Sequence, residues 1–213
     1  MRISHSKKFI FFSNPKTGSE SMRYMLDKYS EIRDVKFKYI TEKNPYYSHI
    51  RPVEVKSIFN REKIDFKSYT KIVCTRNPYV KLVSLYEMIF SKSIFKPNFT
   101  KWLLKTSNKG FGAGKDKPHM KARVYGTYCL KNFISDENGK ILVDEIIPLE
   151  NFKILIPKLF KKLNIPYKDS DMIKINSRKR KKDIKDYYTS EAIDYVKKNY
   201  AWEINKFSYT LPE

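Results

Sequence analysis

The chain has 213 residues, of which 41% are hydrophobic and 15% aromatic, so it is long and apolar enough to bury the core of one domain. Lysine and arginine outnumber aspartate and glutamate by 44 to 23, and the formal net charge of +21 indicates anionic partners. No apolar run approaches the roughly 20 residues of a membrane span, and the apolar stretch at the N-terminus is too short for a signal peptide. The two cysteines, Cys74 and Cys129, exclude a disulfide framework, and Cys74 lies in an apolar run that predicts a buried thiol. We therefore expect one soluble domain over residues 1–213.

The first informative segment is an apolar run over residues 8–13, which predicts a strand and gives way to Asn-Pro-Lys-Thr-Gly-Ser. A helix is predicted to follow over residues 19–29. The N-terminus of a helix offers unpaired backbone N–H groups and the positive end of the helix dipole, while Gly18 permits close approach and Lys16 adds a cation. This strand, loop and helix predict a site for a phosphate or a sulfate.

The second informative segment has the same layout. Residues 71–75 form an apolar, β-branched run that ends in Arg-Asn-Pro and passes into an amphipathic helix over residues 78–90. Asn77 suits the N-cap of that helix, and a proline suits its first position. Arg76 ends the strand and Ser84 comes about two turns into the helix, so both are expected to reach one anion. The two strand-to-helix turns together predict a site for two anionic groups.

The remaining segments also alternate between strand and helix signals. Further strands are predicted over residues 36–40 and 142–147, and further helices over 52–60, 98–105, 119–131, 151–163 and 189–200. This alternation favours an α/β fold. We expect a P-loop-like, three-layer fold with a mostly parallel central sheet flanked by helices.

At this point the sequence resembles a known family, the sulfotransferases that use 3′-phosphoadenosine 5′-phosphosulfate (PAPS), and in particular the carbohydrate sulfotransferases. The likeness covers most of the chain, because Tyr47-Ser-His-Ile, the segment 143–152 and a Tyr-rich C-terminal helix closing on Phe207-Ser-Tyr209 occur in the family's order. The Arg-Asn-Pro-Tyr-x-x-Leu-x-Ser pattern is the more specific motif. The resemblance implies transfer of a sulfuryl group from PAPS to a hydroxyl of a carbohydrate or related acceptor, with 3′-phosphoadenosine 5′-phosphate (PAP) as product and no metal.

Eukaryotic carbohydrate sulfotransferases, among them the uronyl 2-O-sulfotransferases, are usually anchored in the Golgi. The sequence shows no such anchor, so we expect a bacterial or viral source, or a truncated chain, and a cytoplasmic or host-cell intracellular location. The positive charge of the chain also suits an anionic acceptor.

The resemblance assigns individual residues to the cofactor. The 5′-phosphosulfate loop comprises Lys16, Thr17, Gly18, Ser19, Glu20 and Ser21, the 3′-phosphate motif comprises Arg76 and Ser84, and Arg178 matches a late basic loop that closes over the cofactor. Glu20 stands where the family usually has a small hydroxyl residue, so its carboxylate is expected to point away from the ligand. Lys16 is expected to neutralise the charge that grows on the bridging oxygen as the sulfuryl group leaves.

Sulfuryl transfer to a hydroxyl also needs a general base within hydrogen-bond reach of the acceptor oxygen. His5 lies in an N-terminus that we expect to be frayed. His49 matches the position of the histidine base in the uronyl 2-O-sulfotransferases, and its pKa is expected near the usual value of about 6.5. His119 is assigned to the acceptor. Glu54 and His119 remain the alternative bases.

Two other functions agree with parts of the sequence. A small P-loop kinase also has a phosphate cradle after its first strand, but Gly-x-x-x-x-Gly-Lys-Ser/Thr is absent, and here the lysine precedes the glycine. A non-catalytic nucleic-acid-binding protein would account for the charge, although the lysines are spread along the chain. The sulfotransferase is the first hypothesis, and both alternatives stay open.

Overall fold

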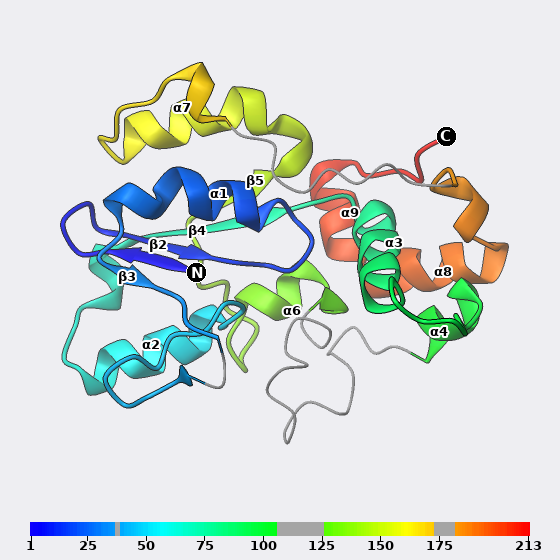
Figure 1. Ribbon diagram of the computed structural model, residues 1–213, viewed down its shortest axis with the longest axis horizontal. Helices are drawn as coiled ribbons and strands as arrows, with labels where there is room; N and C mark the ends of the chain where they lie inside the picture. The colour runs from blue at the N-terminus through cyan, green and yellow to red at the C-terminus, as the bar shows by residue number, and fades with distance from the viewer. Residues whose placement is uncertain (37–38, 106–125, 173–181) are drawn as a thin grey trace. The chain divides into compact units, whose positions relative to one another are not determined.

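The computed structural model describes residues 1–36, 39–105, 126–172 and 182–213. The chain divides into two compact units. Unit 1 consists of Met1–Thr75 with Ile134–Ser177, and unit 2 consists of Arg76–Phe133 with Arg178–Glu213. Unit 1 contains the sheet, and the described part of unit 2 is built from helices (Figure 1).

A five-stranded sheet in the order β3-β1-β2-β4-β5 forms the centre of unit 1. The strands are β1 (Arg2–Ser4), β2 (Phe9–Phe12), β3 (Ile32–Arg33), β4 (Thr70–Thr75) and β5 (Glu145–Pro148). Strand β4 is parallel to both β2 and β5, whereas β1 is antiparallel to both β2 and β3. Only β1 therefore opposes the others, which confirms the prediction of a mostly parallel sheet. The carboxyl ends of β2 and β4 lie at one edge of it.

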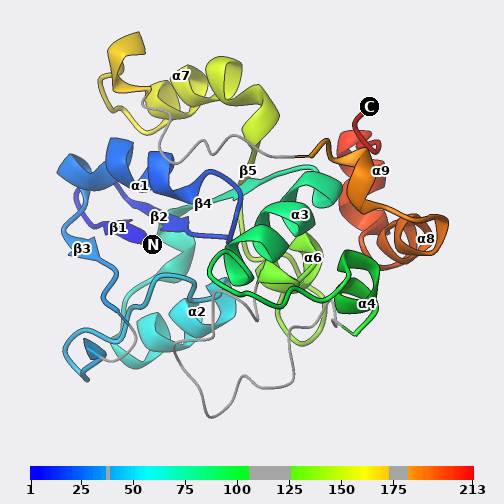
Figure 2. The same ribbon diagram turned by 45° about the vertical axis from the view of Figure 1, so that its right-hand side comes forward.

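Helices cover both faces of this sheet (Figures 1 and 2). Helices α1 (Ser19–Leu26) and α7 (Phe152–Lys162) lie on one face, and α2 (Pro52–Arg61) lies on the other. Phe9 and Phe11 of β2 share a buried cluster with Met22 of α1 and Ile156 of α7. Because side chains alternate along a strand, Ile10 and Phe12 point to the opposite face. Burial of each such side chain contributes about 1.5–3 kcal/mol, so the sheet and these helices stabilise each other.

Unit 2 is centred on an aromatic cluster. Its helices are α3 (Pro78–Ile89), α4 (Phe99–Leu104), α8 (Ser190–Asn199) and α9 (Ala201–Phe207), and α6 (Leu130–Ile134) ends at the boundary with unit 1. The ring of Tyr86 lies 5.3 Å from that of Phe99 and 5.4 Å from that of Trp102, and Phe99 lies 4.9 Å from Tyr188. These contacts join α3 to α4 and to the turn before α8.

Buried polar groups of unit 2 hold the segment that leads into α6. Lys81 of α3 donates from Nζ to the carbonyl oxygen of Tyr128 at 2.7 Å. The carboxylate of Glu203 in α9 accepts from the backbone N–H of Leu130, with both oxygens 3.0 Å away. Lys81 and Glu203 are each about 1% exposed. The segment is therefore fixed through its backbone by two ionisable side chains.

Short 3-10 turns complete the two units. They are η1 (Asp27–Tyr29), η3 (Phe66–Ser68), η5 (Leu149–Asn151) and η6 (Asp169–Asp171) in unit 1 and η7 (Lys185–Tyr187) in unit 2. The α/β prediction is confirmed, and five of the predicted helices, α2, α3, α4, α7 and α8, begin and end within one residue of the predicted positions. Cys74 and Cys129 are both buried free thiols, as predicted for Cys74.

The N-terminus differs from its prediction. It was expected to be frayed, but Met1 is fully buried, and β1 pairs on both sides within the sheet. The Nδ1 atom of His5 lies 2.6 Å from the hydroxyl of Tyr69, so this histidine is held at the start of β4. A strand of three residues is too short for its alternation to be visible in the sequence.

Three other predicted elements also differ. The strand predicted over residues 36–40 is wrong in its described part, because the backbone N–H of Tyr39 donates to the carbonyl of Lys36 at 2.8 Å and closes a turn. The helix predicted over residues 119–131 lies mostly outside the described residues, and α6 begins only at Leu130. The Tyr-rich C-terminal helix that was expected to close on Phe207-Ser-Tyr209 is divided into α8 and α9, with Tyr200 between them.

Candidate active site

The loop between β2 and α1 is closed by its own polar groups. The hydroxyls of Thr17 and Ser19 both donate to the carbonyl oxygen of Asn14, at 2.8 and 2.6 Å. The side-chain amide of Asn14 donates in turn to the carbonyl of Cys74 at 3.3 Å, which ties the loop to β4. All four residues are buried. Thr17 and Ser19 therefore build the loop with their hydroxyls and are able to offer a ligand their backbone N–H groups.

The backbone of this loop is shaped as a concave cradle. Lys16 has a φ of 65° and Gly18 a φ of 81°, so two left-handed residues alternate with Thr17. Such alternation turns successive N–H groups toward one point and is typical of anion-binding loops. The first bond of α1 runs from the N–H of Met22 to the carbonyl of Gly18, so the N–H groups of residues 19–21 precede the helical hydrogen bonds. No side chain of the described residues caps this helix. The cradle fits an oxyanion.

Gly18 is required by packing as well as by its conformation. A Cβ atom at this position would lie 2.6 Å from Leu149 Cδ1 and 3.2 Å from Phe152 Cζ. Both neighbours follow β5, in the segment Val143-Asp-Glu-Ile-Ile-Pro-Leu-Glu-Asn-Phe that the sequence analysis singled out. The cradle therefore rests directly on the end of β5 and the start of α7.

The side chain of Glu20 pairs with a residue of its own helix, α1. Its side chain is 57% exposed and forms an ion pair with Arg23 one turn later in α1. The positive charge of Arg23 offsets the carboxylate at the N-terminus of the helix, where an anion would otherwise be repelled. The backbone N–H of Glu20 remains part of the cradle.

His49 is bonded to the residue that begins this loop. Its Nδ1 atom lies 2.7 Å from the carbonyl oxygen of Ser13, and a carbonyl only accepts, so Nδ1 carries the proton and Nε2 keeps its lone pair. Burial lowers the pKa of His49 from 6.5 to about 4, although the bond to Ser13 opposes the shift. This differs from the expected value near 6.5. His49 is thus a neutral imidazole over the whole physiological range, which is the state a general base needs.

Glu54, the alternative base, is committed to other bonds. One carboxylate oxygen accepts from the backbone N–H of Arg51 at 2.9 Å and so caps α2. The other oxygen accepts from the hydroxyl of Tyr47. Both carboxylate oxygens therefore serve contacts within the chain, and this geometry favours His49 as the base.

A buried carboxylate organises the residues around His49. Asp34 accepts from the Met1 ammonium at 3.0 Å and from Arg2 through Oδ1, and from Arg23 at 2.9 Å and Ser48 through Oδ2. Burial would raise the pKa of Asp34, but the ammonium group and Arg23 hold it well below its ordinary range. Asp34 therefore stays ionised at the centre of this cluster.

This cluster connects α1 to the segment that carries His49. Arg23 of α1 donates to both Asp34 and Ser48, at 2.9 Å in each case, and Ser48 is the residue before His49. Five residues of this region were not predicted as site residues: Ser13, Asn14, Arg23, Asp34 and Ser48. Asn14 belongs to the Asn-Pro-Lys-Thr-Gly-Ser motif and could have been predicted from it. Nothing in the sequence marks Asp34, because its partners come from three distant segments.

The predicted 3′-phosphate motif lies in unit 2. Asn77 caps α3 by accepting from the N–H of Tyr79 at 3.0 Å, and Pro78 is its first residue, as predicted. Arg76 and Ser84 are both half-buried, and Ser84 lies in the middle of α3. Arg76 is the first residue of unit 2 and follows Thr75, the last residue of β4. The other two candidates, His119 and Arg178, lie outside the described residues.

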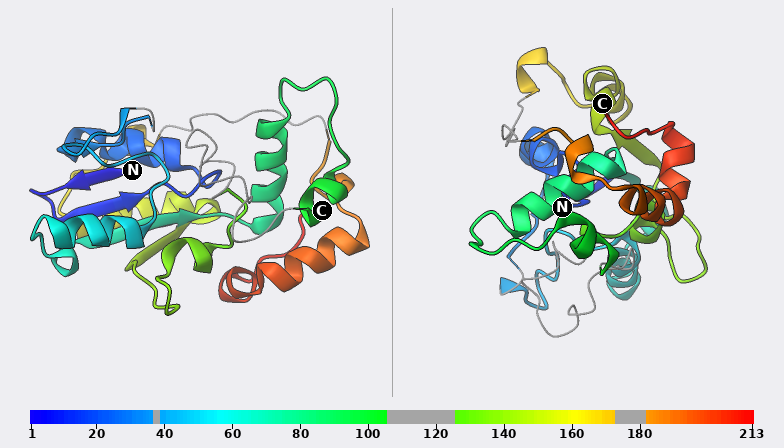
Figure 3. Two further views of the ribbon diagram at one scale, coloured as in Figure 1. Left: turned by 90° about the horizontal axis from the view of Figure 1, so that it is seen from below. Right: turned by 90° about the vertical axis from the view of Figure 1, so that its right-hand side faces the viewer.

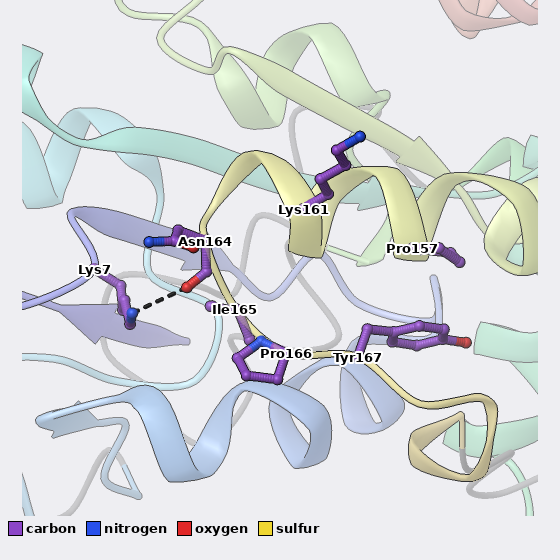
Figure 4. Close-up of a pocket in the computed structure, with 7 residues that line it drawn as sticks. All are labelled: Lys7, Pro157, Lys161, Asn164, Ile165, Pro166 and Tyr167. Carbon is purple, nitrogen blue, oxygen red and sulfur yellow. Dashed lines mark hydrogen bonds between the residues drawn. The ribbon is translucent and has the colours of Figure 1, made fainter.

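A hollow of about 570 Å³ lies elsewhere on unit 1 (Figure 4). It is lined by Lys7, Pro157, Lys161, Asn164, Ile165, Pro166 and Tyr167. Lys7 donates to the carbonyl of Asn164 at 2.9 Å across it. Because Lys7 precedes β2 and Lys16 follows it, the hollow and the cradle lie at opposite ends of that strand. The hollow is therefore not part of the candidate active site.

Two searches of the described residues were negative. No helix in the four described ranges is long and apolar enough to cross a membrane. Within those same ranges, no three His, Cys, Asp or Glu side chains are grouped so that they would hold a metal ion.

Known proteins were compared with this chain at the level of sequence and of structure. Neither a family model nor a curated protein matches the sequence. Among solved structures, the mouse sulfotransferase SULT7A1, crystallised in complex with PAP, is 15% identical with a TM-score of 0.53. The match covers 96% of this chain and 87% of the mouse chain. At this level of identity the likeness concerns the fold, and the chain therefore has the α/β fold of a sulfotransferase.

Proposed function

We propose that this chain is a PAPS-dependent sulfotransferase that transfers a sulfuryl group to a hydroxyl of a carbohydrate or related acceptor. The observation that carries the proposal is the bond from His49 Nδ1 to the carbonyl of Ser13, which keeps a neutral base next to a loop built for an oxyanion. The fold shared with a PAP-bound sulfotransferase supports the same cofactor. We further propose that both units belong to one catalytic domain over residues 1–213.

The cradle would hold the 5′ end of the cofactor. PAPS supplies a sulfuryl group that is already activated on a phosphate. The backbone N–H groups of residues 17–21 and the positive end of the α1 dipole would face the phosphosulfate group. Gly18, which has no side chain, leaves room for it. The side chain of Lys16 adds a cation where negative charge grows on the bridging oxygen, which lowers the barrier to departure of the nucleotide.

His49 would take the proton of the acceptor hydroxyl at Nε2. The bond to Ser13 fixes the tautomer, so the lone pair is always on the nitrogen that faces away from that carbonyl. Arg23 and Asp34 hold Ser48, the residue before His49, in place. A base on an anchored ring accepts a proton with little reorganisation.

Arg76 and Ser84 are proposed to bind the 3′-phosphate, and Arg178 to close over the cofactor. An arginine presents two parallel N–H donors to a phosphate, and a serine adds a third donor. His119 is proposed to contact the acceptor. The carbohydrate class rests on the resemblance of Tyr47-Ser-His-Ile to the histidine segment of the uronyl 2-O-sulfotransferases.

The direct test is a transfer assay with labelled PAPS against a panel of glycans and small alcohols. Label in a glycan is the expected result, and label only in small alcohols would replace the carbohydrate class. Separate titrations with PAP, ATP and duplex DNA test the alternatives. Tight binding of ATP without PAP would favour a kinase, and DNA binding that PAP does not displace would favour a nucleic-acid-binding protein.

A further inference from the structure

The loop between α3 and α4 in unit 2 carries two large apolar side chains in solvent. Ile94 is 92% exposed and Phe95 is 89% exposed. Lys92 and Lys96 flank them and are exposed as well. The loop, residues 91–97, stands out from the helices of unit 2 (Figure 3, left). An isolated exposed apolar residue is ordinary, but two adjacent ones at a protruding tip form a local apolar surface.

This tip is a formed turn. The backbone N–H of Ser93 donates to the carbonyl of Phe90 at 3.1 Å, and its hydroxyl donates to the carbonyl of Phe95 at 2.7 Å. At the base of the loop, the hydroxyl of Tyr86 donates to the carbonyl of Pro97 at 2.6 Å. These bonds pair the polar groups of Ser93 with the carbonyls of Phe90 and Phe95, while the side chains of Ile94 and Phe95 are exposed. Each backbone group that is paired within the chain lowers the cost of entering an apolar medium.

The surroundings of the tip are positively charged. Residues 91–105 contain four lysines and no aspartate or glutamate. The four are Lys92, Lys96, Lys101 and Lys105, and all are exposed. The nearby Glu87 is already shared between Lys96, at 3.6 Å, and the hydroxyl of Tyr187. An apolar tip flanked by Lys92 and Lys96 and followed along the chain by Lys101 and Lys105 is complementary to an anionic lipid surface, where acyl chains lie beneath negatively charged headgroups.

We propose that this loop docks the protein on an anionic lipid bilayer, with Ile94 and Phe95 entering the boundary of the acyl chains and the four lysines facing the headgroups. A protruding tip can be buried only by a partner with a matching groove or by a deformable surface. A bilayer is deformable and needs no preformed groove. A second copy of this chain is a poor occupant, because its own tip would bring a matching set of lysines. This inference is independent of the proposed function.

The test is flotation of the full-length protein with vesicles of phosphatidylcholine alone and of phosphatidylcholine with phosphatidylserine. The wild-type protein is expected to float with the phosphatidylserine vesicles and to bind the neutral vesicles much more weakly. The double variant Ile94→Ser, Phe95→Ser is expected to lose about tenfold or more in affinity for the anionic vesicles. The matched control is Ile154→Ser, which removes a side chain that is 62% exposed on α7 and is expected to bind like the wild type.

The charge requirement has its own pair of variants. Lys92→Gln, Lys96→Gln is expected to weaken binding to the anionic vesicles and to reduce its dependence on salt. Lys153→Gln, Lys158→Gln removes the same charge from exposed positions on α7 and is expected to change binding less. Equal losses in the two pairs would mean that net charge, and not this loop, drives the binding.

Three further results would overturn the proposal. The first is absence of wild-type binding to the anionic vesicles, and the second is unchanged binding by the Ile94→Ser, Phe95→Ser variant. The third is a wild-type dimer in sedimentation equilibrium that this variant abolishes, because the tip would then be an interface between copies. Circular dichroism of each variant verifies that the fold is retained.

Discussion

The Nδ1 atom of His49 and the carbonyl oxygen of Ser13 are 2.7 Å apart. This bond joins the proposed base to the first residue after β2, and the oxyanion cradle begins at the next residue. One stretch of backbone therefore positions both the group that would accept a proton and the groups that would bind the cofactor. Burial of the ring keeps it neutral, with a pKa of about 4.

The first prediction concerns His49 and its pH dependence. His49→Ala is expected to lower the turnover number by about 10²- to 10⁴-fold with little change in PAP affinity. Because the pKa is lowered to about 4, the wild-type rate should stay level through pH 6.5 and fall only as the pH approaches 4. Rates at saturating PAPS across this range are the measurement.

The control for this prediction is His49→Asn, whose amide nitrogen is able to keep the bond to Ser13 but cannot accept a proton. It should be as slow as His49→Ala while retaining wild-type thermal stability. If Glu54→Gln were the crippled variant instead, the carboxylate would be the base.

The second prediction concerns Lys16. Lys16→Ala is expected to reduce the turnover number far more than the affinity for PAP, because the lysine acts on charge that develops only as the sulfuryl group leaves. Lys63→Ala is the matched control, since Lys63 also has a left-handed backbone, with a φ of 57°, but is exposed away from the cradle. A normal turnover number for Lys16→Ala would remove this role.

The third prediction concerns the 3′-phosphate. Arg76→Ala and Ser84→Ala are expected to lower the affinity for PAP much more than the affinity for adenosine 5′-phosphosulfate, which has no 3′-phosphate. Calorimetric titration of both ligands measures the ratio of the losses. Arg61→Ala, at a position exposed at the end of α2, should leave both affinities unchanged. Equal losses for the two ligands would count against the assignment.

The fourth prediction concerns Gly18. Gly18→Ala is expected to destabilise the fold by about 2–4 kcal/mol, because the left-handed backbone costs about 1–2 kcal/mol and the added Cβ meets Leu149 at 2.6 Å. Gly139→Ala separates the two effects, since Gly139 has a φ of 77° and no heavy atom within 4 Å of its Cβ position. Urea unfolding of both variants gives the steric share as their difference. Similar losses of stability in the two variants would show that the Leu149 side chain moves aside at little cost.

The fifth prediction concerns Glu203. Burial raises the pKa of Glu203 from 4.5 to about 7, although Lys81 opposes the shift. A carboxyl group with a higher pKa in the folded chain stabilises it most when protonated, so this contribution is lost as the pH rises from 4.5 through about 7. Glu203→Gln should therefore flatten the pH dependence of the urea midpoint in this window. The exposed Glu191→Gln should not, and parallel curves for Glu203→Gln and wild type would contradict the shift.

Much of the fold was predictable because its signals are local. The run before Ser13 and the run before Arg76 are continuous apolar segments, and each is followed by residues that begin a helix: Gly18 in one case, Asn77 and Pro78 in the other. Both strands and both helices form where they were predicted, except that α1 ends at Leu26 and residues 27–29 form the 3-10 turn η1. The exceptions, β1 and β3, have three and two residues and exist because of their neighbours in the sheet.

The candidate site was predictable only in part, because only some of its signals are local in the sequence. Lys16 and Gly18 belong to one short motif, whereas the contact of Gly18 with Leu149 and the cluster around Asp34 join residues far apart in the chain. The pKa of His49 was misjudged because burial of the ring depends on tertiary packing. Arg76 and Ser84 stay predictions.

The antiparallel position of β1 beside β2 has a consequence for the order of folding. These two strands form a hairpin with a four-residue connection, so their contacts close a small loop early and at low entropic cost. The parallel pairs, Phe9 with Thr70 and Ile72 with Glu145, require closure of long loops and are expected to form late. Nascent chains should therefore acquire the hairpin before the loop between β2 and α1 takes its final shape, because that loop needs β4 and β5 beside it.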